Sequence, residues 1–192
     1  HNGRRRQRQM CIRDRLLGTS DGPFVVSSGS DNLALTPNNV TVNRETTDGT
    51  ANLRPVGASR ATIFIDRTRT KIRELAYNLE VDGFSTPDLT LIAEHITTGN
   101  AKELAYTRSP DSLIWTLLDT GELRCLTYER AQDVVAWHRH ILGASSTAPA
   151  KVKSIAAISS ADELEEQLYM VVERSIGAVS YTHLTLPTTT IV

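Results

Sequence analysis

The sequence predicts a mainly β fold made of antiparallel β-hairpin repeats with one short helix, and three observations support this. Runs rich in β-branched and aromatic residues, such as Ala61–Ile65 and Leu113–Leu118, are separated by turn-forming residues. Hairpins of this kind recur along the chain at a fixed spacing. One segment, near residues 85–99, has apolar residues at helical spacing. The expected fold is therefore mainly β with one short helix.

The hairpin repeat has a period of roughly fifty residues. A shift of 51 positions aligns the two best copies without a gap, and the strand at 167–172 follows its counterpart at 112–117 by 55. Such a period, with several short antiparallel strands, is typical of β-propeller blades. We therefore expect part of a β-propeller-like domain, with an antiparallel sandwich as the alternative. The shift aligns Phe64 with Trp115, Ile72 with Leu123, Arg73 with Arg124, Leu75 with Leu126, and Tyr77 with Tyr128.

The two ends of the chain mirror each other at the level of DNA. With one choice of codons, the reverse complement of Met10–Asp14 translates as Val179–His183, and the match continues outward to both tips. The nucleotide string resembles the adapter of transposase-based sequencing libraries. We interpret residues 1–15 and 178–192 as adapter-derived and expect an internal fragment between them. The alternative is an Arg-rich nucleic-acid-binding arm with a Thr-rich tail.

Excluding these ends changes the charge balance. Removing six Arg and one Asp from 21 basic and 22 acidic residues leaves a net charge of −6, so no specific nucleic-acid partner is expected. Cys125 is then the single cysteine, which excludes an intrachain disulfide. No apolar run approaches the length of a membrane span, so no membrane partner is expected.

Residues 16–60 are expected to form a strand followed by a loop-rich connection. Phe24–Val26 is the strand, and residues 39–42 and 51–54 are short alternating runs within the polar connection. Residues 61–177 are expected to hold propeller-like β repeats at about 61–100, 101–143 and 151–177. Their expected strands are Ala61–Ile65, Lys71–Tyr77, Leu113–Leu118, Glu122–Tyr128, Val134–His140, Val152–Ile158 and Gln167–Arg174.

The helix is predicted from capping residues and from periodicity. Ser85–Asp88 supplies a cap and places Pro87 in the first turn. Gly99 is expected to end the helix. The apolar residues at helical spacing are Leu89, Ile92, Ala93 and Ile96.

Candidate catalytic patterns have simpler structural explanations. Asp119–Gly121 resembles the aspartic-protease signature, but a hairpin turn explains these residues fully, and Glu122 stands where a small residue normally follows. Cys125 is expected to be buried with Leu117 and Leu123 between neighbouring blades. The chain has no phosphate loop, no Gly-x-Ser-x-Gly and no Cys-x-x-Cys. No catalytic residue is therefore assigned.

Binding patterns are also weak. His138 and His140 share one face of a strand and could hold a metal with a third ligand, but no acid or cysteine lies at ligand spacing in the sequence. Neither a metal-binding nor a cofactor-binding residue is assigned, and no cofactor is expected. Asp162–Glu166 is expected to be a solvated loop. Four aromatic residues could form a carbohydrate platform but are more typical of a core: Tyr106, Trp115, Tyr128 and Trp137.

Several short runs between Leu16 and Gly177 form a distinctive series. They are Val56-Gly57, Arg60-Ala61, Lys71–Tyr77, Asp82–Phe84, Pro87–Thr90, Ala93–Thr97, Pro110–Trp115, Leu126–Arg130 and Val134–His140. The series resembles the later part of a large tail-associated structural protein of short-tailed bacteriophages, sometimes related to the tail-tube nozzle. Ala136 departs from the resemblance, because Gly is expected there.

The resemblance implies a non-catalytic structural component of a bacteriophage tail. Its expected partners are other tail proteins of the virion and further copies of the full-length protein. Its expected location is the virion tail, with the host cytoplasm during assembly. The alternatives are a bacterial β-propeller that binds carbohydrate or protein, and an enzyme on a propeller scaffold.

Overall fold

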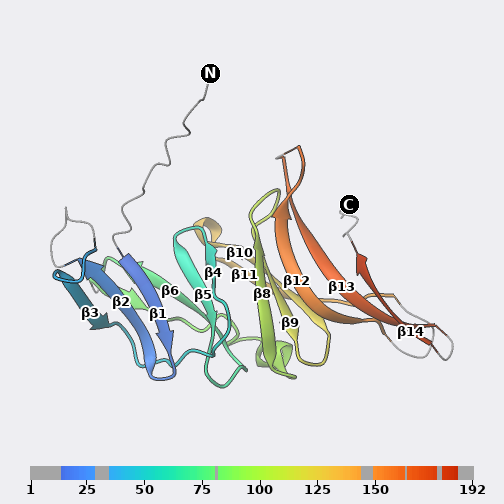
Figure 1. The fold of residues 1–192 in the computed structure, drawn as a ribbon, viewed down its shortest axis with the longest axis horizontal. Helices are drawn as coiled ribbons and strands as arrows, with labels where there is room; N and C mark the ends of the chain where they lie inside the picture. Colours follow the sequence, from blue (N-terminus) through green and yellow to red (C-terminus); the bar gives the residue numbers. More distant parts are fainter. Residues whose placement is uncertain are drawn as a thin grey trace.

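The computed structural model describes residues 14–28, 35–80, 82–143, 149–162, 164–176 and 179–185. Strands within these residues form four antiparallel sheets, which confirms the prediction of a mainly β, antiparallel fold. The sheets follow one another across the molecule in the order of the sequence, from blue to red (Figure 1). Over the same residues, no helix is long and apolar enough to cross a lipid bilayer.

The first sheet pairs β1 (Asp14–Thr19), β2 (Gly22–Ser28) and β3 (Val40–Arg44) in that order. β2 contains the predicted strand at 24–26, and Val25 and Val26 within it are buried. β3 covers most of the alternating run at 39–42, but every residue of β3 is exposed. Exposure of every residue is typical of a short strand at the edge of a sheet.

The second and third sheets are four-stranded meanders in which consecutive strands are neighbours. The second sheet contains β4 (Val56–Ala58), β5 (Ala61–Ile65), β6 (Ile72–Asn78) and β7 (Gly83–Ser85). The third sheet contains β8 (Ala101–Thr107), β9 (Leu113–Leu118), β10 (Leu123–Glu129) and β11 (Val134–His140). The predicted strands at 61–65, 71–77, 113–118, 122–128 and 134–140 are confirmed within one residue at either end.

The fourth sheet pairs β12 (Lys151–Ser159), β13 (Glu166–Ile176) and β14 (Val179–Thr185). β12 and β13 confirm the predicted strands at 152–158 and 167–174. β14 lies within the segment that we interpret as adapter-derived. Its Val, Tyr and Thr residues favour a strand, and the edge of β13 offers free backbone groups for it to pair with.

One predicted run is not a strand. Residues 51–54 were expected to alternate as a weak edge strand, but the Leu53 N–H donates to the Ala51 carbonyl over 2.8 Å in a local turn. Thr50, just before this turn, forms an isolated bridge with Asp66 at the end of β5. The first strand of the second sheet is therefore interrupted after Thr50 and resumes as β4.

Equivalent backbone hydrogen bonds join each sheet to the next. The N–H groups of Thr50, Ala101 and Val152 donate to the carbonyls of Thr19, Arg69 and Gly121, each over 2.8 Å. The three donors are 51 residues apart along the chain, which is the shift that aligns the two best hairpins. The periodicity of the sequence therefore extends to all three junctions between the four sheets.

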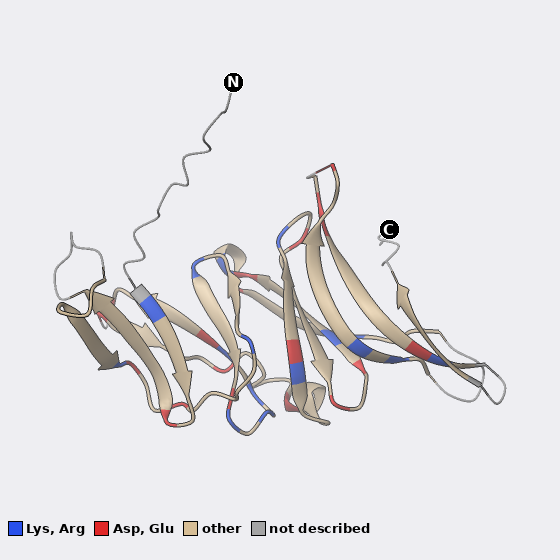
Figure 2. Cartoon of the chain, viewed as in Figure 1, with Lys and Arg blue, Asp and Glu red and all other residues tan. Residues whose placement is uncertain are grey.

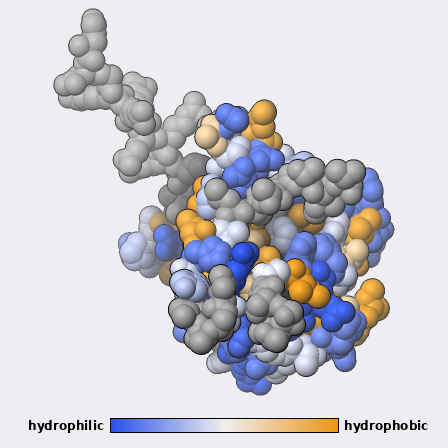
Figure 3. All heavy atoms as spheres, turned by 90° about the vertical axis from the view of Figure 1, so that its right-hand side faces the viewer, coloured by the Kyte–Doolittle hydropathy of each residue, from blue (hydrophilic) through white to orange (hydrophobic). Residues whose placement is uncertain are grey.

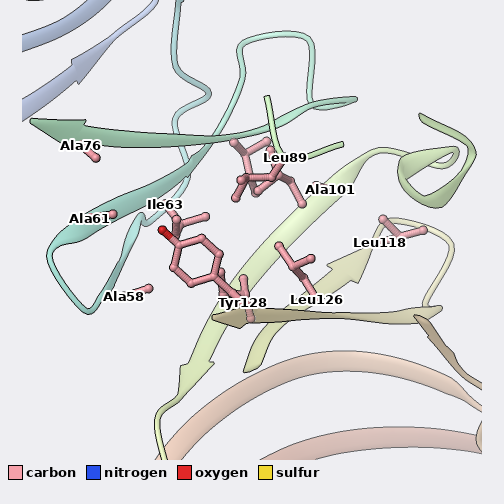
Figure 4. Packing of buried hydrophobic residues seen from close by; sticks show 12 residues of the cluster. Ala58, Ala61, Ile63, Ala76, Leu89, Ala101, Leu118, Leu126 and Tyr128 are labelled. Carbon is pink, nitrogen blue, oxygen red and sulfur yellow. The ribbon is translucent and has the colours of Figure 1, made fainter. Parts of the chain in front are cut away.

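Two apolar cores lie on opposite faces of the third sheet. The first core joins it to the second sheet, and Figure 4 shows Tyr128 of β10 beside Ile63 of β5. The second core joins the third sheet to the fourth. It contains Ala105, Leu117, Leu123, Ala150, Val152, Ile155, Leu168, Met170 and Val172. The predicted burial of Leu117, Leu123 and Cys125 is confirmed, since each is at most 2% exposed.

The predicted helix near residues 85–99 is wrong except for one 3-10 turn, η1 (Glu94–Thr97). The Pro87 carbonyl accepts from the Glu74 N–H over 3.1 Å, and the Leu89 N–H donates to the Ile72 carbonyl over 2.9 Å. These bonds hold the segment extended beside β6, so it cannot begin a helix. The apolar spacing does not mark one buried face either, because Ile92 is 85% exposed.

The Asp119–Gly121 motif forms the turn between β9 and β10, which confirms the hairpin interpretation. The Gly121 N–H donates to the Leu118 carbonyl over 2.9 Å, and Gly121 has φ +86°. Asp119 forms an ion pair with Arg69 in the corresponding turn of the second sheet, with an N–O distance of 2.8 Å. These residues therefore form the turn of the third sheet and link it to the second sheet.

Gly121→Ala is expected to lower the free energy of unfolding by about 1–3 kcal/mol. Gly121 has φ +86°, a backbone conformation that is strained for a residue with a side chain. The new Cβ would also lie 2.8 Å from Lys151 Cβ. Gly57→Ala is the control, because a Cβ there meets nothing within 4 Å. Equal urea midpoints for the two variants would contradict this prediction.

Candidate functional site

A cysteine and two histidines converge on one face of the third sheet. Cys125 of β10 lies directly opposite His138 of β11, and His140 lies two residues further along β11 on the same face. One potential ligand atom from each residue lies within 4.8 Å of the others. Cys125 is fully buried, and both histidines are partly buried. The three side chains therefore form a compact cluster of one sulfur and two imidazoles.

The protonation states of the cluster follow from burial. Burial raises the pKa of the Cys125 thiol to about 12, so the free thiol carries its proton at neutral pH. Burial also lowers the pKa of His140, and the neighbouring His138 lowers it further. His140 is therefore neutral at neutral pH. A protonated thiol is a poor nucleophile, so the cluster is unsuited to thiol catalysis without a further base or cation.

Aromatic packing surrounds His140. Its ring centroid lies 4.9 Å from that of Trp115 and 4.9 Å from that of His138. His140 Nε2 is buried and has no hydrogen-bond partner among the described residues. His140 also lines a cleft of about 150 Å³ between the β9–β10 turn and the start of β12. The cluster is therefore covered on one side and adjoins solvent on the other.

The sequence prediction recognised the two histidines but did not find their third neighbour. Cys125 lies 13 residues before His138, and neither residue belongs to a Cys-x-x-Cys pair or to a His pair with zinc-motif spacing that would have marked the site in the sequence. The two residues meet because η2 (Arg130–Gln132) and Asp133 close the β10–β11 connection in one register. Asp133 adopts φ +54° in this connection. The length of the connection sets the strand register, so it is the sequence signal that could have identified Cys125 and His138 as neighbours.

A second candidate site is a groove of about 740 Å³ beside β4, β8 and β12, the first strands of three successive sheets. Lys102 Nζ donates to the Lys153 carbonyl over 3.0 Å, and the Glu103 carboxylate accepts from the Ile155 N–H over 2.9 Å. These charges therefore join β8 to β12. Glu103 is the single acid among the described lining residues, so the groove holds no pair of carboxylates for acid–base chemistry.

The four aromatic residues belong to the packed cores or their margins, as expected, and do not form the alternative carbohydrate platform. Tyr128 is 2% exposed, and Trp137 Nε1 donates to the Leu89 carbonyl over 2.8 Å. Trp115 Nε1 donates to Thr107 Oγ1 over 3.1 Å. The Tyr106 hydroxyl oxygen lies 3.1 Å from Ser112 Oγ. The interpretation of these residues as core is confirmed.

Among the described residues, charged side chains do not gather on one sheet, and the face drawn in Figure 3 shows no single apolar patch. Acidic and basic residues are interspersed over the four sheets (Figure 2). On the side of the fourth sheet, apolar residues stand separately among hydrophilic ones (Figure 3). The acidic loop is exposed at Asp162, while Glu166 accepts a hydrogen bond from the Arg108 N–H over 2.5 Å. His95 in η1 is exposed and lies apart from the cluster.

Comparisons with known proteins add little. No protein-family model matches the chain, and no curated protein matches it. Among solved structures, a luciferin-regenerating enzyme is similar at 13% identity over 82% of this chain, with a TM-score of 0.42. The chain spans about half of that structure, 53% of its length. A likeness this distant carries no argument about function.

Proposed function

We propose that this chain is a section of a non-catalytic structural protein of a bacteriophage tail, in which propeller-like blades build a stiff wall. The observation that carries the proposal is the repeated junction between sheets. Three backbone hydrogen bonds with the same 51-residue spacing of their donors join four consecutive sheets. The series of short runs that resembles the tail proteins spans the same residues.

The contacts between sheets favour a rigid element. Apolar cores cover both faces of the third sheet, and the first strands of three successive sheets lie together, with β8 in contact with β4 and β12. In propellers, the first strand of each blade lies nearest the axis. Such stacking resists bending because a sheet that is packed on both faces cannot move independently of its neighbours. A wall of this kind requires a fixed geometry and does not require catalytic residues.

The same architecture implies partners. The outward face of β13 carries Tyr169 and Val171, which are only partly buried, whereas Leu168 and Val172 on the other face are buried. In a repeat protein, a further blade or a further copy of the protein covers such a face. Other tail proteins and copies of the full-length protein are therefore the proposed partners, in the virion and in the host cytoplasm during assembly.

The proposal is tested on the complete gene. Sequencing the source DNA across both ends is expected to extend the reading frame beyond Leu16 and Gly177, next to portal and terminase genes. The complete protein, purified and imaged by cryo-electron microscopy, is expected to form rings or tubes. A protein that stays monomeric, lies among genes without virion functions, and binds glycans on an array would overturn the proposal in favour of the carbohydrate-binding alternative.

A further inference from the structure

We propose that Cys125, His138 and His140 bind a zinc ion that ties β10 to β11. The inference does not depend on the function proposed above. It rests on three side chains from two neighbouring strands, which direct one sulfur and two nitrogen donors toward a common point.

The geometry of the cluster is close to that of a zinc site. Zinc binds thiolate sulfur at about 2.3 Å and imidazole nitrogen at about 2.0–2.1 Å, so tetrahedral donors lie roughly 3.5 Å apart. The three donors lie within 4.8 Å of one another without an ion. Rotation about the side-chain torsions of the two partly buried histidines closes this difference, while the register of the hairpin stays unchanged.

The donor set selects the ion. Sulfur and imidazole nitrogen suit zinc, whereas calcium and magnesium prefer oxygen ligands. Three protein ligands leave a fourth tetrahedral position, which we assign to water. Of the three ligands, His140 alone lines the neighbouring cleft, and we take this cleft as the entry for the ion and this water.

A buried nitrogen without a partner also favours an ion over simple packing. His140 Nε2 is buried, and no donor or acceptor among the described residues satisfies it. Buried polar groups are almost always satisfied by protein, water or a bound ion. Trp115 packs against the His140 ring, so the site has the kind of neighbouring shell that surrounds established metal ligands.

A bound ion would stabilise the outer hairpin of the third sheet. β11 is the last strand in the order of this sheet and pairs with β10 alone. A metal that bridges Cys125 and the two histidines would join these strands on one face, in addition to their backbone hydrogen bonds. Because the unfolded chain does not hold the three ligands together, binding also favours the folded state.

The test uses the full chain carrying Cys11→Ser, so that Cys125 is the single thiol. Zinc is titrated against a chromophoric chelator, and cobalt(II) serves as a spectroscopic probe. We expect one zinc ion per chain and a sulfur-to-cobalt charge-transfer band in the near ultraviolet. Cys125→Ser is expected to abolish that band. His138→Gln and His140→Gln are each expected to weaken zinc binding at least about 100-fold, because even residues outside the ligand shell contribute 10–100-fold.

His95→Gln is the matched control, since it removes an exposed histidine outside the cluster and is expected to leave zinc affinity unchanged. Circular dichroism identifies variants that fail to fold. If Cys125→Ser unfolds, the two histidine variants decide the question, because their side chains are only partly buried. The proposal is overturned if the folded chain binds no zinc, or if binding survives both histidine substitutions undiminished.

Discussion

Leu126→Ala is expected to lower the free energy of unfolding by about 2–5 kcal/mol. Leu126 lies in the centre of β10, is fully buried, and belongs to the core between the second and third sheets (Figure 4). Truncation removes apolar contacts and leaves a cavity that surrounding strands cannot easily fill, because paired strands hold the backbone on both sides. A loss of this size is a large part of the total stability of a small domain.

Urea denaturation followed by circular dichroism measures this effect. Leu91→Ala is the control, because Leu91 is 66% exposed and its truncation is expected to change stability by less than about 0.5 kcal/mol. Leu117→Ala truncates an equally buried leucine in the second core. We expect similar losses for Leu126→Ala and Leu117→Ala. A loss below about 1 kcal/mol for Leu126→Ala would show that the two sheets do not pack as the structure indicates.

Strands with strong local patterns could be predicted from the sequence, and weak ones could not. β5 and β9 are rich in β-branched or aromatic residues, so local propensity and tertiary structure agree. β8 was not predicted, because Lys102, Glu103 and Ala105 have low strand propensity. It becomes a strand through pairing with β9 and through hydrogen bonds that the Glu103 carboxylate accepts from Ser154 and Ile155 of β12. Tertiary contacts, which the sequence does not display, decide such segments.

The incorrect helix has a related cause. The segment from Ser85 to Gly99 carries helix-capping residues and apolar periodicity, and both are local signals. Its backbone instead pairs with β6, and Thr90 donates through both N–H and hydroxyl to the Asp88 carboxylate, over 2.8 and 2.6 Å. Asp and Thr residues often make such local bonds in competition with a helix. Pairing with the edge of β6 therefore outweighs a local helix signal of moderate length.

The candidate site could also be predicted only in part from the sequence. The His-x-His pattern predicts two side chains on one face of a strand, and the structure confirms this placement. The opposite residue, Cys125, depends on the length and conformation of the β10–β11 connection. The sequence therefore supplies the donor types, while the register supplies their convergence.

Arg130→Met is expected to lower the free energy of unfolding by about 2–3 kcal/mol, between the values for exposed and fully buried ion pairs. The Glu74 side chain is 5% exposed and lies on the face of β6 that holds Ile72 and Ala76 of the first core. Its carboxylate is 2.8 Å from Arg130 of the third sheet, whose side chain is 52% exposed. Removing the guanidinium leaves a buried carboxylate without its cation, next to the buried Tyr128.

The burial of Tyr128 itself and the nearby Glu74 charge explain why this phenol resists ionisation. Burial raises the pKa of Tyr128, and the neighbouring Glu74 charge raises it further. Tyr128 therefore stays neutral. Because a phenol carries no positive charge in either protonation state, Tyr128 cannot replace Arg130 as the counter-charge of Glu74. The ion pair between Glu74 and Arg130 links the second and third sheets through charge. It lies in the region where the first core links the same sheets through apolar contacts.

Two further variants isolate the contribution of charge. Arg44→Met breaks the exposed pair between Arg44 and Asp21, whose side chains are 38% and 74% exposed, and is expected to cost less than about 1 kcal/mol. Adding Glu74→Gln to Arg130→Met removes the unpaired charge, so the double variant is expected to recover most of the lost stability. If Arg130→Met costs no more than Arg44→Met, or if Glu74→Gln restores nothing, then water rather than Arg130 stabilises the Glu74 carboxylate in the folded protein.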